Sequence, residues 1–143
     1  MSTLDDVDEL IKQYHLALDA FMKGNAEPAK ELFSHQEDVT LANPYGPPVR
    51  GWARVSQTLE HAASLRRDGE LVGVENIAKY VSAELAYVVE IERIKAKVGE
   101  RQDVTPYALR VTMIFRPEQG SWKVIHRHAD AITTAQPVES VLQ

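Results

Sequence analysis

Three polar side chains near the end of the sequence have the types and the spacing of a chemical site. His126, His128 and Asp130 occupy alternate positions in the segment GSWKVIHRHAD, which has the pattern of a β-strand. Alternate residues on a strand point to the same face, so neighbours in this row project together, roughly 7 Å apart along the strand. Imidazole and carboxylate groups in such a row suit acid–base catalysis, a divalent metal, a polar network or a subunit interface.

We expect the row to form a polar network or an interface rather than a metal site, because paired side chains explain it without an ion. His126 and His128 remain candidates for acid–base catalysis, and we expect neither a metal nor another cofactor. The residues predicted for the network or interface are Glu92, Arg110, Thr112, His126, His128 and Asp130.

Composition excludes several classes of protein. The chain has 143 residues, a net charge of −5 and no cysteine. An acidic protein is a poor partner for nucleic acid, and a chain without cysteine has neither disulfides nor thiolate chemistry. No apolar run approaches the ~20 residues that a membrane helix needs, and no signal peptide is evident. We therefore expect a cytoplasmic protein that binds neither nucleic acid nor membrane.

The hydrophobic periodicity predicts helices first and strands later. Apolar residues recur at helical spacing over residues 4–22, with Thr3 as the expected cap, over 25–34, and from Gly51 to Asp68-Gly69. A short strand is expected at 39–42, and long strands at 72–81, 86–98, 104–116 and 122–133. This order predicts an α+β fold with the helices on one face of a single sheet. We predict one domain, residues 1–134, followed by a tail, residues 135–143.

The alternation within the strands predicts which side chains face the helices. The mostly apolar set is assigned to that face, since burying several charges would be costly unless all were paired. The complementary set, with Glu90, Glu92 and the two histidines, is then expected on the outer face. Trp122, Val124 and Ile114 would make the outer face apolar enough to need a partner subunit, which favours a homodimer. The set expected on the helix side is Tyr87, Val89, Ile91, Arg93, Leu109, Val111, Met113, Phe115, Ile125, Arg127 and Ala129.

The order of elements and four segments resemble the nuclear transport factor 2-like superfamily. The segments are SHQEDVTL (residues 34–41), GWARV (51–55), LRVT (109–112) and GSWKVIHRHAD (120–130). The superfamily includes ketosteroid isomerase, the SnoaL-like polyketide cyclases and the calcium/calmodulin-dependent kinase association domain, and the chain looks most like the uncharacterised SnoaL-like group. The resemblance implies a cone-shaped, cystatin-like fold around a pocket, and dimers through the outer sheet face.

The resemblance also implies how a site would be arranged. Tyr14 matches the tyrosine that donates a hydrogen bond to the substrate oxyanion in ketosteroid isomerase. Asn43 stands where that enzyme has its aspartate base, and an amide cannot accept a proton at neutral pH. The second oxyanion donor falls at or near Val111. Two of the three groups are missing, so the steroid isomerase mechanism is not expected.

Other residues are candidates for the pocket itself. Tyr45 and Trp52 are expected as aromatic walls beside Tyr14. Arg93 and Arg127 stand out in the apolar set, where they either bind an anion or extend to water at strand ends. The residues predicted to line the pocket are Tyr14, Asn43, Tyr45, Trp52, Arg93, Val111, Met113 and Arg127.

Two functions follow from this sequence. The first is binding of a small, largely apolar ligand with one polar or anionic group, with or without cofactor-independent isomerase, cyclase or hydratase chemistry. The second is a non-catalytic association module that oligomerises through the histidine-bearing face.

Overall fold

A computed structural model describes residues 2–143 and contains three α-helices and six strands within that range. The helices are α1 (Thr3–Phe21), α2 (Glu27–Leu32) and α3 (Trp52–Ser64), with a 3₁₀ helix, η1 (Val138–Val141), in the tail. The strands are β1 (Thr40–Ala42), β2 (Val49–Arg50), β3 (Arg66–Val81), β4 (Ala86–Val98), β5 (Thr105–Glu118) and β6 (Ser121–Asp130).

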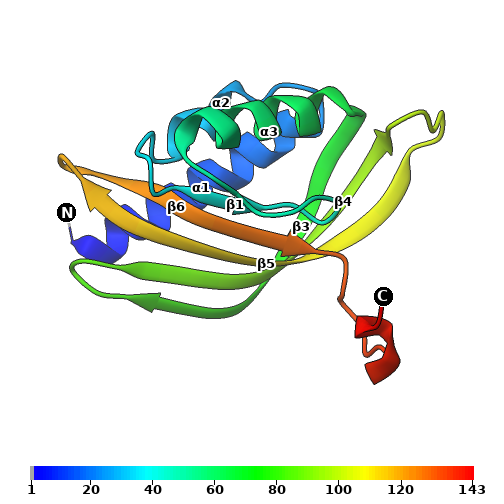
Figure 1. Ribbon diagram of the computed structural model, residues 1–143. Helices are drawn as coiled ribbons and strands as arrows, with labels where there is room; N and C mark the ends of the chain where they lie inside the picture. Colours follow the sequence, from blue (N-terminus) through cyan, green and yellow to red (C-terminus); the bar gives the residue numbers. More distant parts are fainter. Residues whose placement is uncertain (1) are drawn as a thin grey trace.

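The six strands form one sheet that is covered by the helices on one face only. Its order is β2-β1-β6-β5-β4-β3. Strand β1 runs parallel to β6, and the other neighbours are antiparallel. Figure 1 shows the three α-helices together on one side of the sheet, and no described helix on the other. The predicted α+β arrangement is confirmed, and the core lies between the helices and the sheet.

Helix α1 packs along the sheet through one apolar stripe. Its start is capped by Ser2, whose hydroxyl accepts a hydrogen bond from the Asp5 N–H at 3.1 Å, and not by the predicted Thr3. Asp5 and Asp6 in the first turn complement the positive end of the helix dipole. The stripe buries Val7, Leu10, Tyr14, Ala17, Leu18 and Phe21. Tyr14 is thus held on the face that meets the sheet.

Helix α3 ends several residues before the predicted stop at Asp68-Gly69. It ends at Ser64, and β3 begins at Arg66 rather than near Leu71. The first residues of β3 pair with the end of β4, Arg66 with Val98. A bulge between Arg67 and Glu70, with Asp68 at φ 53°, makes this part of the strand irregular and hides its alternation. Arg66 therefore lies on the sheet beneath the helices instead of on a helix.

The predicted faces of β4 are reversed. Glu90 and Glu92 are 1% and 0% exposed on the helix-covered face, and Arg93 is exposed on the outer face. The register explains this, because Glu90 pairs with Val111 and therefore shares its face. Apolar residues occupy both faces of β4, so hydrophobicity alone did not distinguish them. The other residues wrongly assigned to the helix side are Tyr87, Val89 and Ile91.

Strands β5 and β6 confirm most of the predicted faces, with one local inversion. Leu109, Val111, Met113 and Phe115 are buried as predicted. Two consecutive residues of β5, Ile114 and Phe115, pair with His126 and Val124 of β6. Ile125 of β6 is therefore an extra, bulged residue. Before this bulge the faces change over: Val124 is fully buried and Trp122 packs against the core, both against the prediction. After it, Arg127 and Ala129 are buried and the two histidines lie on the outer face, as predicted.

The chain beyond β6 leaves the body of the domain. Figure 1 shows η1 apart from the sheet and helices. Val138, Val141 and Leu142 are each more than 70% exposed. No helix within residues 2–143 has both the length and the hydropathy needed to cross a bilayer.

Candidate functional site

The helix-covered face of the sheet contains a buried ion pair between two strands. The Arg127 guanidinium on β6 donates two hydrogen bonds to the Glu92 carboxylate on β4, at 2.8 and 2.7 Å. Both side chains are almost completely buried. The Arg127 guanidinium also lies 5.2 Å from the centre of the Tyr14 ring, a cation–π distance. The charge of Arg127 is therefore compensated within the protein, and Glu92 does not join Arg110 as the sequence suggested.

A second buried carboxylate is bonded to the first helix. His15 Nε2 lies 3.0 Å from Glu90 Oε1, and the side chain of Glu90 is only 2% exposed. This contact links α1 to β4 beside the Glu92–Arg127 pair. It gives Glu90 a hydrogen-bonding partner, which explains how a carboxylate is accommodated on this face.

A fourth buried charged side chain on this face, Arg66, has no compensating charge. Arg66 is 8% exposed, and its Nη1 donates hydrogen bonds to the Tyr45 hydroxyl at 3.2 Å and the Ala62 carbonyl at 2.9 Å. Its Nε–H is buried without a hydrogen-bond partner, and Arg66 forms no ion pair with any carboxylate among residues 2–143. Burial disfavours its charge, yet interactions with Tyr107 and Tyr45 raise the pKa of Arg66 overall. Arg66 is thus a buried cation surrounded by neutral groups.

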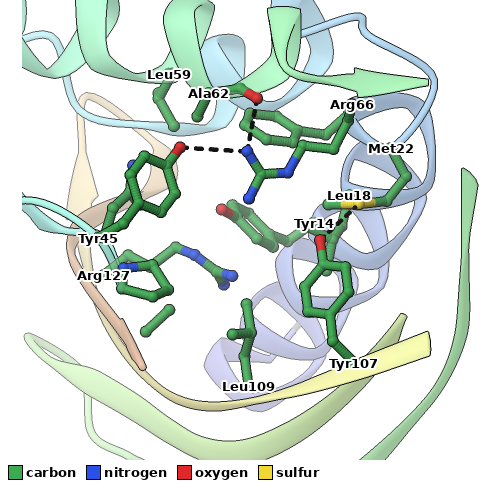
Figure 2. A pocket seen from close by; sticks show the side chains of 14 residues that line it. Tyr14, Leu18, Met22, Tyr45, Leu59, Ala62, Arg66, Tyr107, Leu109 and Arg127 are labelled. Atoms are coloured by element: carbon green, nitrogen blue, oxygen red, sulfur yellow. Dashed lines mark hydrogen bonds between the residues drawn. The ribbon is translucent and has the colours of Figure 1, made fainter. Parts of the chain in front are cut away.

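The two buried arginines, Arg66 and Arg127, line a small cavity between the helices and the sheet. Its volume is about 40 Å³. Figure 2 shows the Tyr14 hydroxyl inside it, between the guanidinium groups of Arg66 and Arg127. The polar lining comes from Tyr14, Asn43, Tyr45, Arg66, Tyr107 and Arg127, and apolar side chains such as Leu18, Phe21, Leu59 and Leu109 supply the rest. No aspartate, glutamate or histidine is among the lining residues.

Tyr14 is a free hydrogen-bond donor in this cavity. The neighbouring polar groups bond elsewhere: Arg66 to Tyr45, and the Tyr107 hydroxyl to the Met22 sulfur at 3.3 Å. No residue from 2 to 143 bonds to the Tyr14 hydroxyl. Burial raises the pKa of Tyr14 to about 12, although Arg127 acts in the opposite direction. The phenol is therefore neutral at physiological pH and can donate a hydrogen bond to an oxygen of a ligand.

An apolar groove lies against the cavity on its outer side. Its volume is about 360 Å³. Pro44, Tyr45, Arg66, Tyr107 and Leu109 line both the cavity and the groove, so the two spaces adjoin at these residues. Val98 and Ala131 extend the apolar surface of the groove. The inner cavity therefore has most of the polar groups, and the outer groove is mainly apolar.

Four of the eight residues predicted for the pocket line the cavity: Tyr14, Asn43, Tyr45 and Arg127. Val111 and Met113 are buried on the same face but belong to the core instead. Trp52 stacks on His35, with ring centres 3.8 Å apart, and does not reach the cavity. Arg93 lies on the outer face and bonds to Glu75 at 3.1 Å. Arg66, which the sequence analysis did not select, lines both the cavity and the groove.

The polar row on the outer face is divided into two separate groups of contacts on β1, β5 and β6. The His126 Nδ1 lies 2.7 Å from the Thr40 hydroxyl oxygen, and Arg110 donates to both oxygens of Asp130. His128 Nε2 lies 3.1 Å from the same carboxylate. Burial lowers the pKa of His126, with a further contribution from His128. The sheet separates both imidazoles from the cavity, and no three His, Cys, Asp or Glu side chains within residues 2–143 are placed to hold a metal ion.

Comparison with known proteins identifies the family. The model of the SnoaL-like domain matches residues 7–133. The chain belongs to the SnoaL-like family. No protein with a curated description matches the sequence of this SnoaL-like chain.

Solved structures agree with this assignment. A nuclear transport factor 2-like superfamily protein from Salmonella enterica has a TM-score of 0.76 at 16% identity, over 94% of each chain. A ketosteroid isomerase-like protein from Erwinia carotovora atroseptica has a TM-score of 0.75 at 18% identity, over 93% of this chain and 98% of its own. An uncharacterised Caulobacter vibrioides protein with a cystatin-like fold has a TM-score of 0.68 at 17% identity, over 96% and 93%. At these identities the likeness establishes the fold and leaves the function open.

Proposed function

We propose that this SnoaL-like protein binds a small, largely apolar molecule whose one polar group accepts a hydrogen bond from Tyr14. The observation that carries this proposal is the unpartnered Tyr14 hydroxyl in a cavity with apolar walls, next to an apolar groove. The hydroxyl opens onto the cavity and has no partner among residues 2–143, so a ligand oxygen placed there can accept its hydrogen bond.

The lining residues favour binding over proton-transfer catalysis. Asn43 does line the cavity, but its amide cannot act as a base. Glu92 is near but is bonded to Arg127. If the ligand is turned over, we expect a cofactor-independent isomerisation, cyclisation or hydration in which Tyr14 polarises a ligand carbonyl and water takes the proton. The ketosteroid isomerase-like relative has a similar fold, which is compatible with such chemistry but does not require it.

A thermal-shift screen of ring compounds and small carboxylates tests the proposal. We expect some compounds to raise the melting temperature of the wild-type protein and to lose at least tenfold in affinity for Tyr14→Phe, which removes only the hydroxyl. Tyr87→Phe is the matched control, because Tyr87 is exposed on the outer face and stacks on Tyr80. A screen without hits, or hits that bind Tyr14→Phe equally well, would refute the proposal.

A second candidate function is association through the outer face of the sheet. The observation in its favour is an uncovered stack of Tyr80 and Tyr87, 51% and 38% exposed with ring centres 5.6 Å apart. Light scattering should show a homodimer that dissociates in Tyr87→Glu, or in His126→Ala with His128→Ala, if this face is the interface. A monomeric wild-type protein at all accessible concentrations would exclude it.

A further inference from the structure

Arg66 is in an unusual electrostatic situation for a buried cation. The other buried arginine, Arg127, has a carboxylate at hydrogen-bond distance, whereas Arg66 bonds only to a phenol and a backbone carbonyl. Burying a charge without a counter-ion is strongly unfavourable. The chain therefore retains a costly group at the boundary between the cavity and the groove.

A structural role accounts for only part of this side chain. Nη1 of Arg66 caps the last turn of α3 through the Ala62 carbonyl, where a cation is favourable. That contact uses one of the nitrogen atoms. The Nε–H stays buried and unpartnered, and Figure 2 shows the remaining Nη2 pointing into the cavity toward Tyr14. Nη2 is therefore the donor that faces the space that a ligand would occupy.

The sizes of the two spaces indicate how a ligand would divide between them. The cavity, at about 40 Å³, is much the smaller of the two spaces and has the polar lining, so we place the small polar end of a ligand in it. The adjoining groove of about 360 Å³ has the volume for an apolar body, with Tyr107 and Leu109 along its wall.

We propose that Arg66 is the anion anchor of this site and that the ligand is a monocarboxylate with an apolar ring or short chain. The carboxylate lies in the inner cavity, where Arg66 supplies the counter-charge and Tyr14 donates a hydrogen bond. The apolar body lies in the outer groove. This inference rests on the proposed ligand-binding function and adds the charge of the ligand and the residue that selects it.

Matched acid and amide probes test the anchor. Isothermal titration of the intact protein compares phenylacetate, 3-phenylpropionate and hexanoate with their neutral primary amides. We expect at least one acid to bind the wild-type protein tenfold or more tightly than its amide. Arg66→Met should abolish this preference while the amide affinity changes less than threefold. Arg66→Lys, which keeps the charge but not the planar fork, should keep part of the preference.

Arg93→Met is the matched control, because Arg93 is exposed on the outer face, is paired with Glu75 and borders neither the cavity nor the groove. It should keep the full preference for acids. Melting temperatures separate anchoring from a structural role: Arg66→Met should melt at or above the wild-type temperature, since it removes an uncompensated charge.

Each remaining outcome contradicts a defined part of the inference. Acids and amides that bind the wild-type protein equally well would overturn the anchor and leave the proposed function standing. A preference for acids that survives in Arg66→Met would do the same. Binding of neither class would contradict the proposed function and the anchor together. An Arg66→Met protein that melts well below wild type, with Arg66→Lys showing no preference, would make Arg66 a structural cap.

Discussion

The two buried arginines differ in whether a carboxylate compensates their charge. This difference indicates a structural role for Arg127 and a binding role for Arg66. Arg127 is matched by Glu92, so its charge is satisfied before any ligand arrives. Arg66 is matched by nothing within residues 2–143 that carries a negative charge. The sequence analysis placed Arg127 in the pocket, either binding an anion or extending to water at a strand end; in the structure it lines the cavity and is paired with Glu92. Nothing in a single sequence reveals which strand will supply a counter-ion to which arginine.

Arg127→Met should therefore destabilise the fold. It leaves the Glu92 carboxyl unpaired in the core, and breaking a buried pair in this way costs about 3–5 kcal/mol. Urea denaturation measures the loss. The double variant Arg127→Met with Glu92→Met should recover most of it, because neither charge is then buried. Arg110→Met, which breaks the more exposed pair with Asp130, should cost about 1 kcal/mol or less. Equal losses in both single variants would contradict this account of the buried pair.

The raised pKa of Tyr14 makes a prediction about alkaline pH. The folded pKa of about 12 lies above the ordinary value of 10.0, so the native state holds the phenol proton more tightly than the unfolded state. The stabilisation is complete below pH 10 and is lost as the pH rises toward 12. Two pKa units correspond to about 3 kcal/mol. At pH 12 the native phenol is only half ionised, so between pH 9.5 and 12 the wild-type protein should lose about 2 kcal/mol more unfolding free energy than Tyr14→Phe. Parallel pH profiles for the two proteins would show that the hydroxyl is not buried as described.

At the scale of elements, the regular segments were predictable and the irregular ones were not. Helix α1 and strand β5 have clean periods of 3.6 and 2, so both elements were predicted, and the buried face of β5 was predicted correctly. Strand β3 begins directly after α3, and a bulge near its start disrupts the alternation typical of a strand. The sequence analysis therefore assigned its first residues to the helix. Strand β4 has apolar residues on both faces, and the bulge at Ile125 reverses β6 for a few residues. Arg66 was missed because it lies in the first of these irregular places.

The start of β3 should be intolerant of even one extra methyl group. A Cβ added at Gly69 would lie 2.5 Å from the Ala96 Cβ and 2.6 Å from the Lys95 carbonyl oxygen. Such overpacking typically costs about 1–3 kcal/mol. Gly69→Ala should therefore lower the unfolding free energy by that amount and shift Arg66 away from the cavity. Gly73→Ala is the control on the same strand, because a Cβ there meets nothing within 4 Å. Both variants are compared by chemical denaturation, and similar stabilities would contradict the close packing at Gly69.

At the scale of the whole molecule, the fold was predictable because it depends on the order of elements. Three helices followed by long antiparallel strands specify the layers, and the family resemblance carried by a few segments is confirmed. The site depends on side chains that the sheet brings together from distant positions: Tyr14 from α1, Arg66 from β3 and Arg127 from β6. Their spacing in the sequence does not indicate that these three side chains lie close together in the fold. The absence of a base at Asn43, in contrast, was visible from the sequence once the resemblance was recognised.

The stacking of Trp52 on His35, away from the cavity, limits how binding can be observed. Neither Trp52 nor Trp122 is among the residues that line the cavity or the groove. A ligand held between Tyr14 and Arg66 would touch neither indole, so the intrinsic emission of this protein should report unfolding and stay nearly silent on occupancy. Calorimetry or the NMR signals of the tyrosine rings are the suitable readouts instead, and a flat fluorescence titration would be no evidence of an empty site.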